Sequence, residues 1–258
     1  MFRCKQFVVQ QDKCAMKVST DSLLLGSWCR PGSASTILDI GTGTGILSLM
    51  MAQKSHSSCR ITAVEIDDDA ALQAKENFRA SPWPDKLTLF HADFSDWWQQ
   101  NRQRYDVILA NPPWFEYAPS AAHNTRNQQR DEKRTVARQQ STLNLELLFQ
   151  SVATLLTSAG HFYLVLPASA ELQVEMLAEK LHFGLLARLD VKATPAKAPY
   201  CQLWHLGDQA EELNGDDINR DPENNLRAQS IQEIIVRDVK GDYTDTYKTL
   251  CRDFYLNF

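Results

Sequence analysis

The chain of 258 residues has no apolar run long enough to cross a membrane, and its first residues lack the apolar segment of a secretory signal peptide. Its six cysteines are scattered, with no Cys-x-x-Cys pair and no Cys/His cluster at zinc-binding spacing. These absences argue against a membrane protein, a disulfide-stabilised secreted domain and a zinc domain. We therefore expect a cytoplasmic protein with buried, reduced thiols and no metal.

The chain also lacks the excess of positive charge that nucleic-acid-binding proteins usually carry. Lys and Arg total 27, Asp and Glu total 32, and the net charge at pH 7 is −5. The deficit is local, because residues 208–225 carry seven acids and one arginine. This composition predicts a solvated acidic loop. Without it the chain has a net charge of +1, so its overall charge does not exclude RNA as a partner.

Short apolar runs alternate with segments of helical periodicity from residue 35 to about residue 206. Continuous apolar strands between helices predict an α/β fold, in which a parallel sheet is covered on both faces. The last two strands lie close together in sequence, so one of them should be antiparallel. We expect a mostly parallel seven-stranded sheet with one antiparallel strand. The strands are expected at residues 36–40, 60–65, 87–90, 105–110, 162–166, 185–191 and 200–206, with a further strand at 231–236 after the acidic loop.

Helices are expected between these strands and near the end of the chain. The periodicity predicts them over residues 67–80, 143–156, 169–181 and 243–255, with Asp67 near the N-cap of the first. The segment 1–34 precedes the first strand and should cover the cofactor and substrate site of a domain spanning residues 35–258. Within this segment, Lys17, Thr20 and Asp21 are candidates for cofactor contact, and Thr20 or Asp21 could equally be a helix N-cap.

A glycine-rich turn follows the first strand of the sheet. The sequence Asp39-x-Gly41-x-Gly43-x-Gly45 holds three of the ten glycines. Glycine lets the backbone approach a ligand closely, and the helix that follows presents free N–H groups. A tight strand-to-helix turn without a ligand would have the same pattern, so the turn alone does not decide the function.

Acidic residues follow or close three successive strands. Asp39, Glu65 and Asp93 should therefore meet at one edge of a parallel sheet. Glu65 is placed to accept hydrogen bonds from ribose hydroxyls, and Asp93 from an exocyclic adenine amine. Three acids suit an adenosyl ligand with a positive sulfonium better than a pyrophosphate. The alternative is that Glu65 and Asp93 only cap the helices that follow them.

The tetrapeptide Asn111-Pro112-Pro113-Trp114 follows the fourth strand. Two prolines fix the backbone and remove two N–H donors. The Pro112 carbonyl and the Asn111 side-chain oxygen are then fixed acceptors for both hydrogens of an exocyclic amine, and Trp114 can stack on the base that carries it. The pattern predicts a site for a planar amine nucleophile; a rigid loop with a buried tryptophan is the structural alternative.

These residues resemble a known family. The tetrapeptide resembles the [DNS]PP[YFW] motif of amino-directed, S-adenosylmethionine-dependent methyltransferases of the Rossmann-like class, and residues 39–45 resemble their cofactor loop. Residues 5–7, 12–21 and 24–28, together with 243–245 and 254–256, resemble the bacterial tRNA (adenine-N6)-methyltransferases that act on a valine tRNA. The resemblance covers nearly the whole chain except residues 208–225.

The resemblance implies methyl transfer from S-adenosylmethionine to N6 of an adenosine just 3′ of the anticodon, at position 37 of the tRNA. It implies an in-line displacement without metal or covalent intermediate, catalysed by Asn111, Pro112, Pro113 and Trp114. We expect a monomer. Phe115 or Tyr117 could support the base or belong to the core. The cofactor-binding residues would be Lys17, Thr20, Asp39, Gly41, Gly43, Glu65, Asp93 and Asn111.

Two basic segments flank the expected site. Residues 1–18 and residues 123–140 each carry a local charge of +3. A charged run is often only a solvated face, but two of them beside one site favour RNA. The candidate RNA-binding residues are Lys13, Arg126, Arg130, Lys133, Arg134 and Arg138.

Other functions fit parts of the same pattern. The tetrapeptide also suits N2 of guanine in rRNA or the side-chain amide of a protein glutamine. The glycine turn alone would suit a dinucleotide-dependent oxidoreductase, which gives Asn111 no role. A catalytically silent RNA-binding module would have no affinity for the cofactor.

Overall fold

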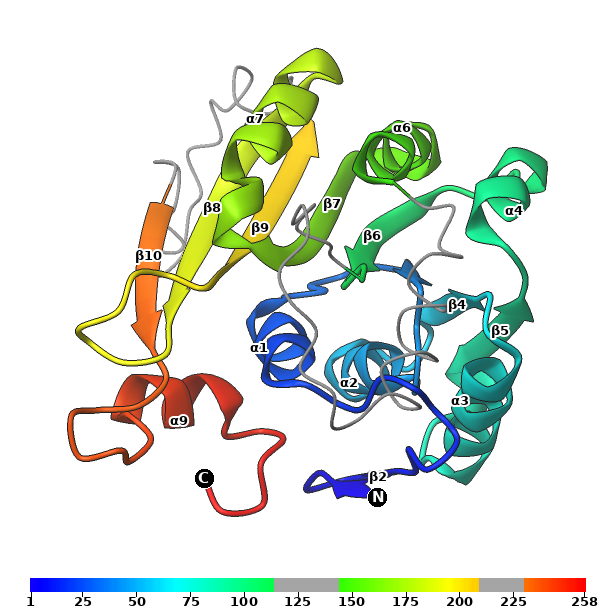
Figure 1. Cartoon of the computed structure of the whole chain (residues 1–258). Helices are drawn as coiled ribbons and strands as arrows, with labels where there is room; N and C mark the ends of the chain where they lie inside the picture. The colour runs from blue at the N-terminus through cyan, green and yellow to red at the C-terminus, as the bar shows by residue number, and fades with distance from the viewer. Residues whose placement is uncertain (114–143, 209–229) are drawn as a thin grey trace, which may run out of the picture.

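The computed structural model describes residues 1–113, 144–208 and 230–258, and helices cover both faces of its main sheet (Figure 1). The helices α1 (Thr20–Trp28), α2 (Ile46–Lys54), α3 (Asp68–Ala80) and α9 (Asp245–Cys251) share one core. The helices α4 (Phe94–Gln100), α6 (Leu145–Leu155) and α7 (Glu171–Lys180) share the other. In the described ranges no helix has both the length and the apolarity needed to span a membrane.

The main sheet has the order β10-β8-β9-β7-β6-β3-β4-β5. Strand β9 pairs antiparallel with β7 and β8, and every other neighbouring pair is parallel. The α/β class, the mostly parallel sheet and the single antiparallel strand are therefore confirmed. The strands are β3 (Thr36–Ile40), β4 (Arg60–Glu65), β5 (Leu87–His91), β6 (Tyr105–Ala110), β7 (Leu156–Pro167), β8 (Phe183–Lys192), β9 (Cys201–Asp208) and β10 (Ser230–Ile235).

The expected number of seven strands is wrong by one. Strand β10 continues the sheet beyond β8, in parallel register from Ser230 opposite Ala187 to Ile235 opposite Lys192. It is the segment expected at residues 231–236, and pairing with β8 brings it into the same sheet. A local sequence pattern predicts a strand but does not show which partner it takes.

Helix starts follow local capping chemistry. Asp67 caps α3 as expected, because its side chain accepts from the backbone nitrogen of Ala70 at 2.8 Å. The N-cap of α1 is Ser19, which accepts from Ser22, so neither Thr20 nor Asp21 is the cap. The two short 3₁₀ turns η1 (Pro84–Lys86) and η2 (Ala168–Ala170) precede β5 and α7.

Other element ends differ from their expected positions. Strand β7 begins directly after α6, so residue 156, which was expected to end the helix, and residues 157–161, which were expected to lie between helix and strand, belong to the sheet. The last helix is shorter than 243–255, because the chain after Cys251 turns back and Tyr255 forms a β-bridge with Cys4. A small ribbon of β1 (Phe2–Arg3) and β2 (Val8–Val9) was not expected. All six cysteines are free and buried, as expected.

The strand order creates a crevice at the carboxyl ends of β3 and β6. The chain passes from β3 to β4 and β5 on one side and then returns to β6 on the other side of β3. Such a reversal point leaves space above the sheet where ligands bind in open α/β folds. The glycine turn leaves β3 at this point, and Asn111, Pro112 and Pro113 leave β6 there.

Candidate active site

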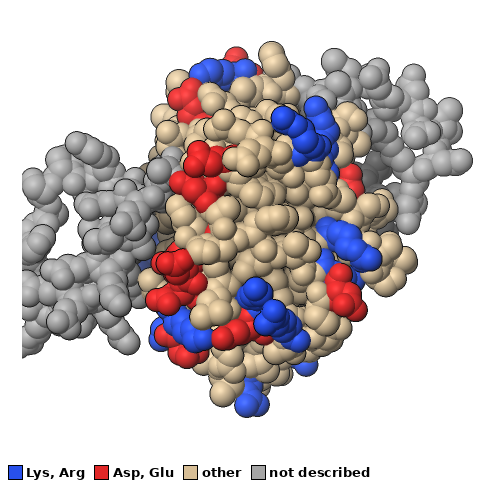
Figure 2. All heavy atoms as spheres, turned by 90° about the vertical axis from the view of Figure 1, so that its right-hand side faces the viewer, with Lys and Arg blue, Asp and Glu red and all other residues tan. Residues whose placement is uncertain are grey.

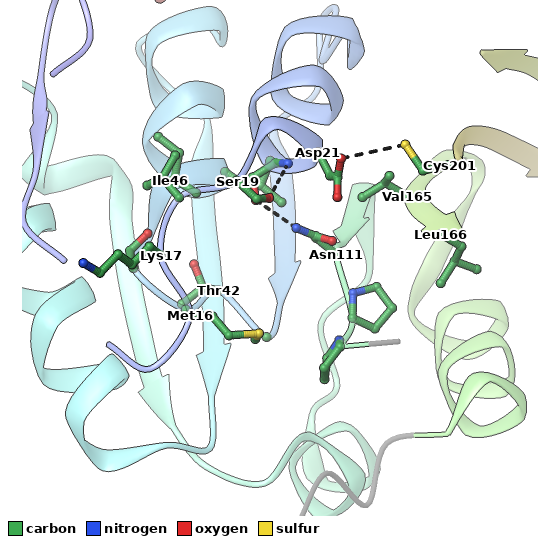
Figure 3. A pocket seen from close by; sticks show the side chains of 18 of the residues that line it. Met16, Lys17, Ser19, Asp21, Thr42, Ile46, Asn111, Val165, Leu166 and Cys201 are labelled. Atoms are coloured by element: carbon green, nitrogen blue, oxygen red, sulfur yellow. Dashed lines mark hydrogen bonds between the residues drawn. The ribbon is translucent and has the colours of Figure 1, made fainter. Parts of the chain in front are cut away.

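A cavity of about 330 Å³ occupies this crevice (Figure 3). It is within the size range of small-molecule sites. Four parts of the chain line it: residues 16–19 and 21–22 before and within α1, residues 41–44 and 46–47 after β3, residues 111–113 after β6, and residues 165–167 of β7 together with 200–201, just before and at the start of β9. The cavity therefore brings the glycine turn and the first three residues of the tetrapeptide together.

The glycine turn leaves room for a ligand. Gly41, Gly43 and Gly45 have φ values of +68°, +57° and +83°, in the region that side chains other than glycine rarely adopt. A Cβ on Gly45 would lie 2.5 Å from Cε1 of Phe78, so this glycine lets α2 and α3 pack closely. A Cβ on Gly41 or Gly43 would meet nothing within 4 Å and would occupy open space.

Asp39 lies beneath the turn rather than in the cavity. Its fully buried carboxylate accepts at Oδ2 from Thr42 Oγ1 at 2.6 Å and from the backbone nitrogen and hydroxyl of Ser48 at 3.0 and 2.7 Å. Burial raises the pKa of Asp39, and these hydrogen bonds oppose the rise. Asp39 thus connects the turn to the first helical residues of α2, while contact with the cofactor stays a prediction.

The three acids meet at one edge, as the strand pattern predicts, because β3, β4 and β5 are parallel neighbours. Glu65 accepts from the backbone nitrogen of Gly43, which fixes it beside the turn. Asp93 is the N-cap of α4 and accepts from the backbone nitrogen of Ser95 at 2.8 Å. Asp93 therefore does cap the helix that follows it, and whether it also binds the cofactor is not decided by this contact. Contacts of these acids with a ligand stay predictions.

The side chain of Asn111 lies in the cavity, and a hydrogen bond holds its amide nitrogen. Its Nδ2 donates to Ser22 Oγ at 2.8 Å, and Figure 3 shows this nitrogen directed toward the start of α1. Pro112 and Pro113 follow it along the cavity wall. Trp114 lies outside the described residues. Ser22 was not foreseen, because no pattern in one sequence indicates that a helix residue 89 positions away meets Asn111.

The cavity holds a second group of polar side chains, of which the sequence predicted only Asp21. Asp21 accepts at Oδ1 from the Tyr200 hydroxyl at 3.3 Å and from Cys201 Sγ at 3.8 Å. Burial raises the pKa of Asp21, and both hydrogen bonds oppose the rise. Lys17 also lines the cavity, whereas Thr20 is exposed on α1 and does not. Tyr200 and Cys201 lie just before and at the start of β9, 179 and 180 residues from Asp21, so local spacing could not place them here.

Comparison with known proteins identifies the family of this fold and cavity. The Methyltransferase small domain family matches residues 14–128. A tRNA1(Val) (adenine(37)-N6)-methyltransferase of Proteus mirabilis is 37% identical over 257 residues, which cover 100% of this chain and 94% of the relative. The chain belongs to the tRNA1(Val) (adenine(37)-N6)-methyltransferase family.

Solved structures agree with this assignment at the level of the fold. A predicted O-methyltransferase from Agrobacterium tumefaciens superposes with a TM-score of 0.64 at 14% identity, over 91% of this chain and 96% of its own. The 16S rRNA N2 G1207 methyltransferase of T. thermophilus, solved with AdoMet and guanosine, gives 0.51 at 21% identity, over 75% of this chain and 44% of its own. The Rossmann-like methyltransferase fold is thereby confirmed.

The residues of the cavity fit the methyl donor of this methyltransferase family. S-adenosylmethionine has carboxylate and ammonium groups at one end and an adenosine at the other. The cavity offers Lys17 and Asp21, of opposite charge, and beside it are the open space at Gly43 and the carboxylate of Glu65. The donor set therefore matches a zwitterionic nucleoside. Among residues 1–113, 144–208 and 230–258, no group of three or more His, Cys, Asp or Glu could hold a metal ion.

The expected RNA contacts are only partly described in this methyltransferase. Lys13 Nζ forms an exposed ion pair of 2.7 Å with Glu76 Oε1 on α3, and its side chain does not line the cavity. Arg126, Arg130, Lys133, Arg134 and Arg138 lie outside the described residues, as does most of the acidic segment 208–225. Figure 2 shows acidic and basic side chains interspersed on one face of the described residues. The RNA contacts stay predictions.

Proposed function

We propose that this chain methylates N6 of adenosine 37 in tRNA1(Val), with S-adenosylmethionine as the methyl donor. The observation that carries the proposal is the cavity shared by the glycine turn and by Asn111, Pro112 and Pro113. Direct methyl transfer requires the binding site of the methyl donor and the group that binds the target amine to lie in one cavity. The names of the relatives, which match over 94% or more of their length, supply the nucleotide and the tRNA. A cytoplasmic monomer that needs no metal remains part of the proposal.

S-adenosylmethionine supplies an electrophilic methyl group on a positive sulfonium. We propose that Gly41 and Gly43 admit it, that Glu65 accepts from its ribose, and that Asp93 accepts from its adenine amine. Lys17 would face its carboxylate, with Asp21 facing its ammonium and Thr20 at the same end. Asp39 would act by holding the turn. The segment 1–34 contributes one wall of the cavity, which supports its proposed role as a cap.

At the adenine amine that accepts the methyl group, the enzyme has to position the nitrogen and stabilise its developing charge. The adenine amine is a weak nucleophile because its lone pair is conjugated with the ring. Hydrogen bonds from both N6 hydrogens to Asn111 Oδ1 and to the Pro112 carbonyl would favour a pyramidal nitrogen with its lone pair facing the methyl carbon. They would also stabilise the positive charge that develops on nitrogen. Alignment and fixed dipoles would therefore supply most of the rate enhancement.

The target base must leave the anticodon loop to reach the cavity. Trp114 is the proposed stacking platform, because it directly follows the amine-binding residues. The basic residues Lys13, Arg126, Arg130, Lys133, Arg134 and Arg138 are the proposed phosphate contacts.

Methyl transfer to total tRNA that lacks this modification tests the proposal. The expected product is N6-methyladenosine in the valine tRNA, detected by mass analysis of nucleosides after digestion. Parallel reactions with rRNA and protein fractions test the nearest alternatives. N2-methylguanosine in rRNA, methylglutamine in protein, or no transfer to tRNA would overturn the assignment.

A further inference from the structure

Asn111 belongs to a chain of hydrogen bonds that reaches the start of α1. Asn111 Nδ2 donates to Ser22 Oγ at 2.8 Å. The Ser22 and Ser19 hydroxyls are 3.1 Å apart, and the Ser22 backbone nitrogen donates to Ser19 Oγ at 3.2 Å. Ser22 is only 7% exposed, and Ser19, Ser22 and Asn111 all line the cavity. The three side chains therefore connect the reacting region to a fixed helix end.

The hydroxyl groups of this chain can be given an order of donation. A serine hydroxyl has one hydrogen to donate and two lone pairs to accept with. Ser22 Oγ receives a hydrogen from Asn111, so its own hydrogen is available for Ser19 Oγ, which already accepts from the backbone of α1. Either hydroxyl can donate in the Ser19–Ser22 contact. The order Asn111 to Ser22 to Ser19 is the one in which Ser22 both accepts from Asn111 and uses its own hydrogen, and our proposal takes this order. With Nδ2 committed to this chain, Oδ1 of Asn111 is the amide atom left for an acceptor role.

We propose that Ser22 is a positioning residue that sets the orientation of the Asn111 amide, so that the oxygen and not the NH₂ group meets the target amine. The inference rests on the proposed function and adds to it a residue that acts through Asn111. The two orientations of an amide have nearly the same shape but opposite hydrogen-bonding character. A rotated amide would present N–H groups to the N–H groups of the base, and the base would lose one of its two acceptors.

Without Ser22 Oγ, the Asn111 amide could rotate so that its NH₂ group meets the target amine. The fraction of enzyme with the competent orientation would fall, and turnover would fall with it. The affinity for the cofactor would change little. The Asn111 amide would face the target base, and α1 and the glycine turn would remain in place. This separation distinguishes a positioning role from a general loss of structure.

Ser22→Ala tests the proposal directly, and Ser27→Ala is the matched control on the same helix. Ser27 is also buried but does not line the cavity. Ser22→Ala should lower kcat for tRNA methylation roughly tenfold, the effect of one lost buried hydrogen bond. The Kd of S-adenosylhomocysteine, measured by calorimetry, should stay within about twofold. Ser22→Thr, which keeps the hydroxyl on the same carbon, should recover most of the kcat.

A second comparison uses Asn111→Asp as the background. A carboxylate has two equivalent oxygens, so its rotation has no consequence, and Ser22→Ala should then cost far less than tenfold. An undiminished loss in that background would assign Ser22 to the shape of the cavity and overturn the proposal. If Asn111→Asp has no turnover, the comparison of the alanine and threonine variants with Ser27→Ala decides.

The controls distinguish a failure of the proposed function from a failure of the proposed role of Ser22. If the unmodified enzyme forms no N6-methyladenosine in tRNA, the proposed function fails. If it does and Ser22→Ala has the same kcat as Ser27→Ala, only the role of Ser22 fails. A loss of cofactor affinity equal to the loss of kcat would also overturn the positioning role.

Discussion

The carboxylate of Glu65 accepts a 2.7 Å hydrogen bond from the backbone nitrogen of Gly43, 22 residues earlier in the chain. Its other oxygen accepts from the backbone nitrogens of Ile66 and Asp67 at 2.9 and 3.0 Å. The acid at the end of β4 therefore fixes the turn that follows β3. Burial raises the pKa of Glu65, and these three hydrogen bonds oppose the rise. Because a carboxylate has about four acceptor sites, it can still receive a ribose hydroxyl.

Gly43→Ala should weaken binding of S-adenosylmethionine at least about tenfold, because the added methyl group would occupy open space at the turn. Gly32→Ala is the matched control: Gly32 has a φ of +53° and open space around it, but does not line the cavity. Both variants pay a backbone strain of about 1 kcal/mol. Calorimetric titration with the cofactor measures the difference. Equal affinities would show that the methyl group at Gly43 occupies no space that the cofactor needs.

Asn111→Ala should lower turnover roughly 10²-fold or more, because it removes a hydrogen-bond acceptor aimed at the positive charge that develops on the amine nitrogen. Cofactor affinity should stay within about threefold. Asn101→Ala, at the end of α4 and outside the cavity, is the control and should behave as the unmodified enzyme. Single-turnover methylation with saturating cofactor measures the effect. A defect confined to cofactor binding would argue against the role of Asn111 in holding the amine.

Local sequence chemistry predicts the parts of this molecule that local forces determine. The core strands follow from apolar runs, and the start of α3 follows from Asp67 at its N-cap. The eighth strand was found as a segment, but its pairing with β8 depends on tertiary contacts. The same limit applies to the site. Gly43 and Asn111 carry recognisable motifs, whereas Ser22 and Tyr200 reach the cavity only because distant elements pack together.

Arg130→Ala and Arg134→Ala should each weaken tRNA binding and reduce the salt dependence of log Kd by roughly one unit, because each removes one phosphate contact. Arg60→Ala is a suitable control, since Arg60 is an exposed arginine at the amino end of β4, opposite the cavity. Filter binding at several salt concentrations measures both effects. Unchanged affinity in both variants would place the RNA surface elsewhere.

Lys86 holds the end of α2 from a buried position. Its ammonium donates to the carbonyls of Ala52 and Ser55, both at 2.8 Å, and to the Ser55 hydroxyl at 3.3 Å. Lys86→Met should lower the free energy of unfolding by about 2–3 kcal/mol, because these carbonyls lose a charged donor. Lys248→Met, at a more exposed ion pair on α9, should cost less than about 1 kcal/mol. Urea denaturation of both variants measures the contrast, and equal losses would contradict the capping role.

His205 should make stability depend on pH. Its ring stacks on Tyr163 with centroids 4.1 Å apart, and its Nε2 lies 3.1 Å from Nδ1 of His161. Burial, and then the charge of His161, lowers the pKa of His205 to about 3. The unfolded chain binds a proton near pH 6.5 that the folded chain excludes. The stability from the neutral ring is therefore complete above about pH 6.5 and is lost as the pH falls toward about 3.

His205→Phe keeps a stacked ring but cannot titrate. Between about pH 7 and pH 5, the free energy of unfolding of the unmodified protein should fall by about 1–2 kcal/mol more than that of the variant. Urea denaturation at several pH values in this range gives the two slopes, and the slope rather than the absolute stability is the readout. Parallel slopes would mean that the His205 ring binds its proton equally well in the folded and unfolded chain, which its partial burial between β7 and α1 argues against.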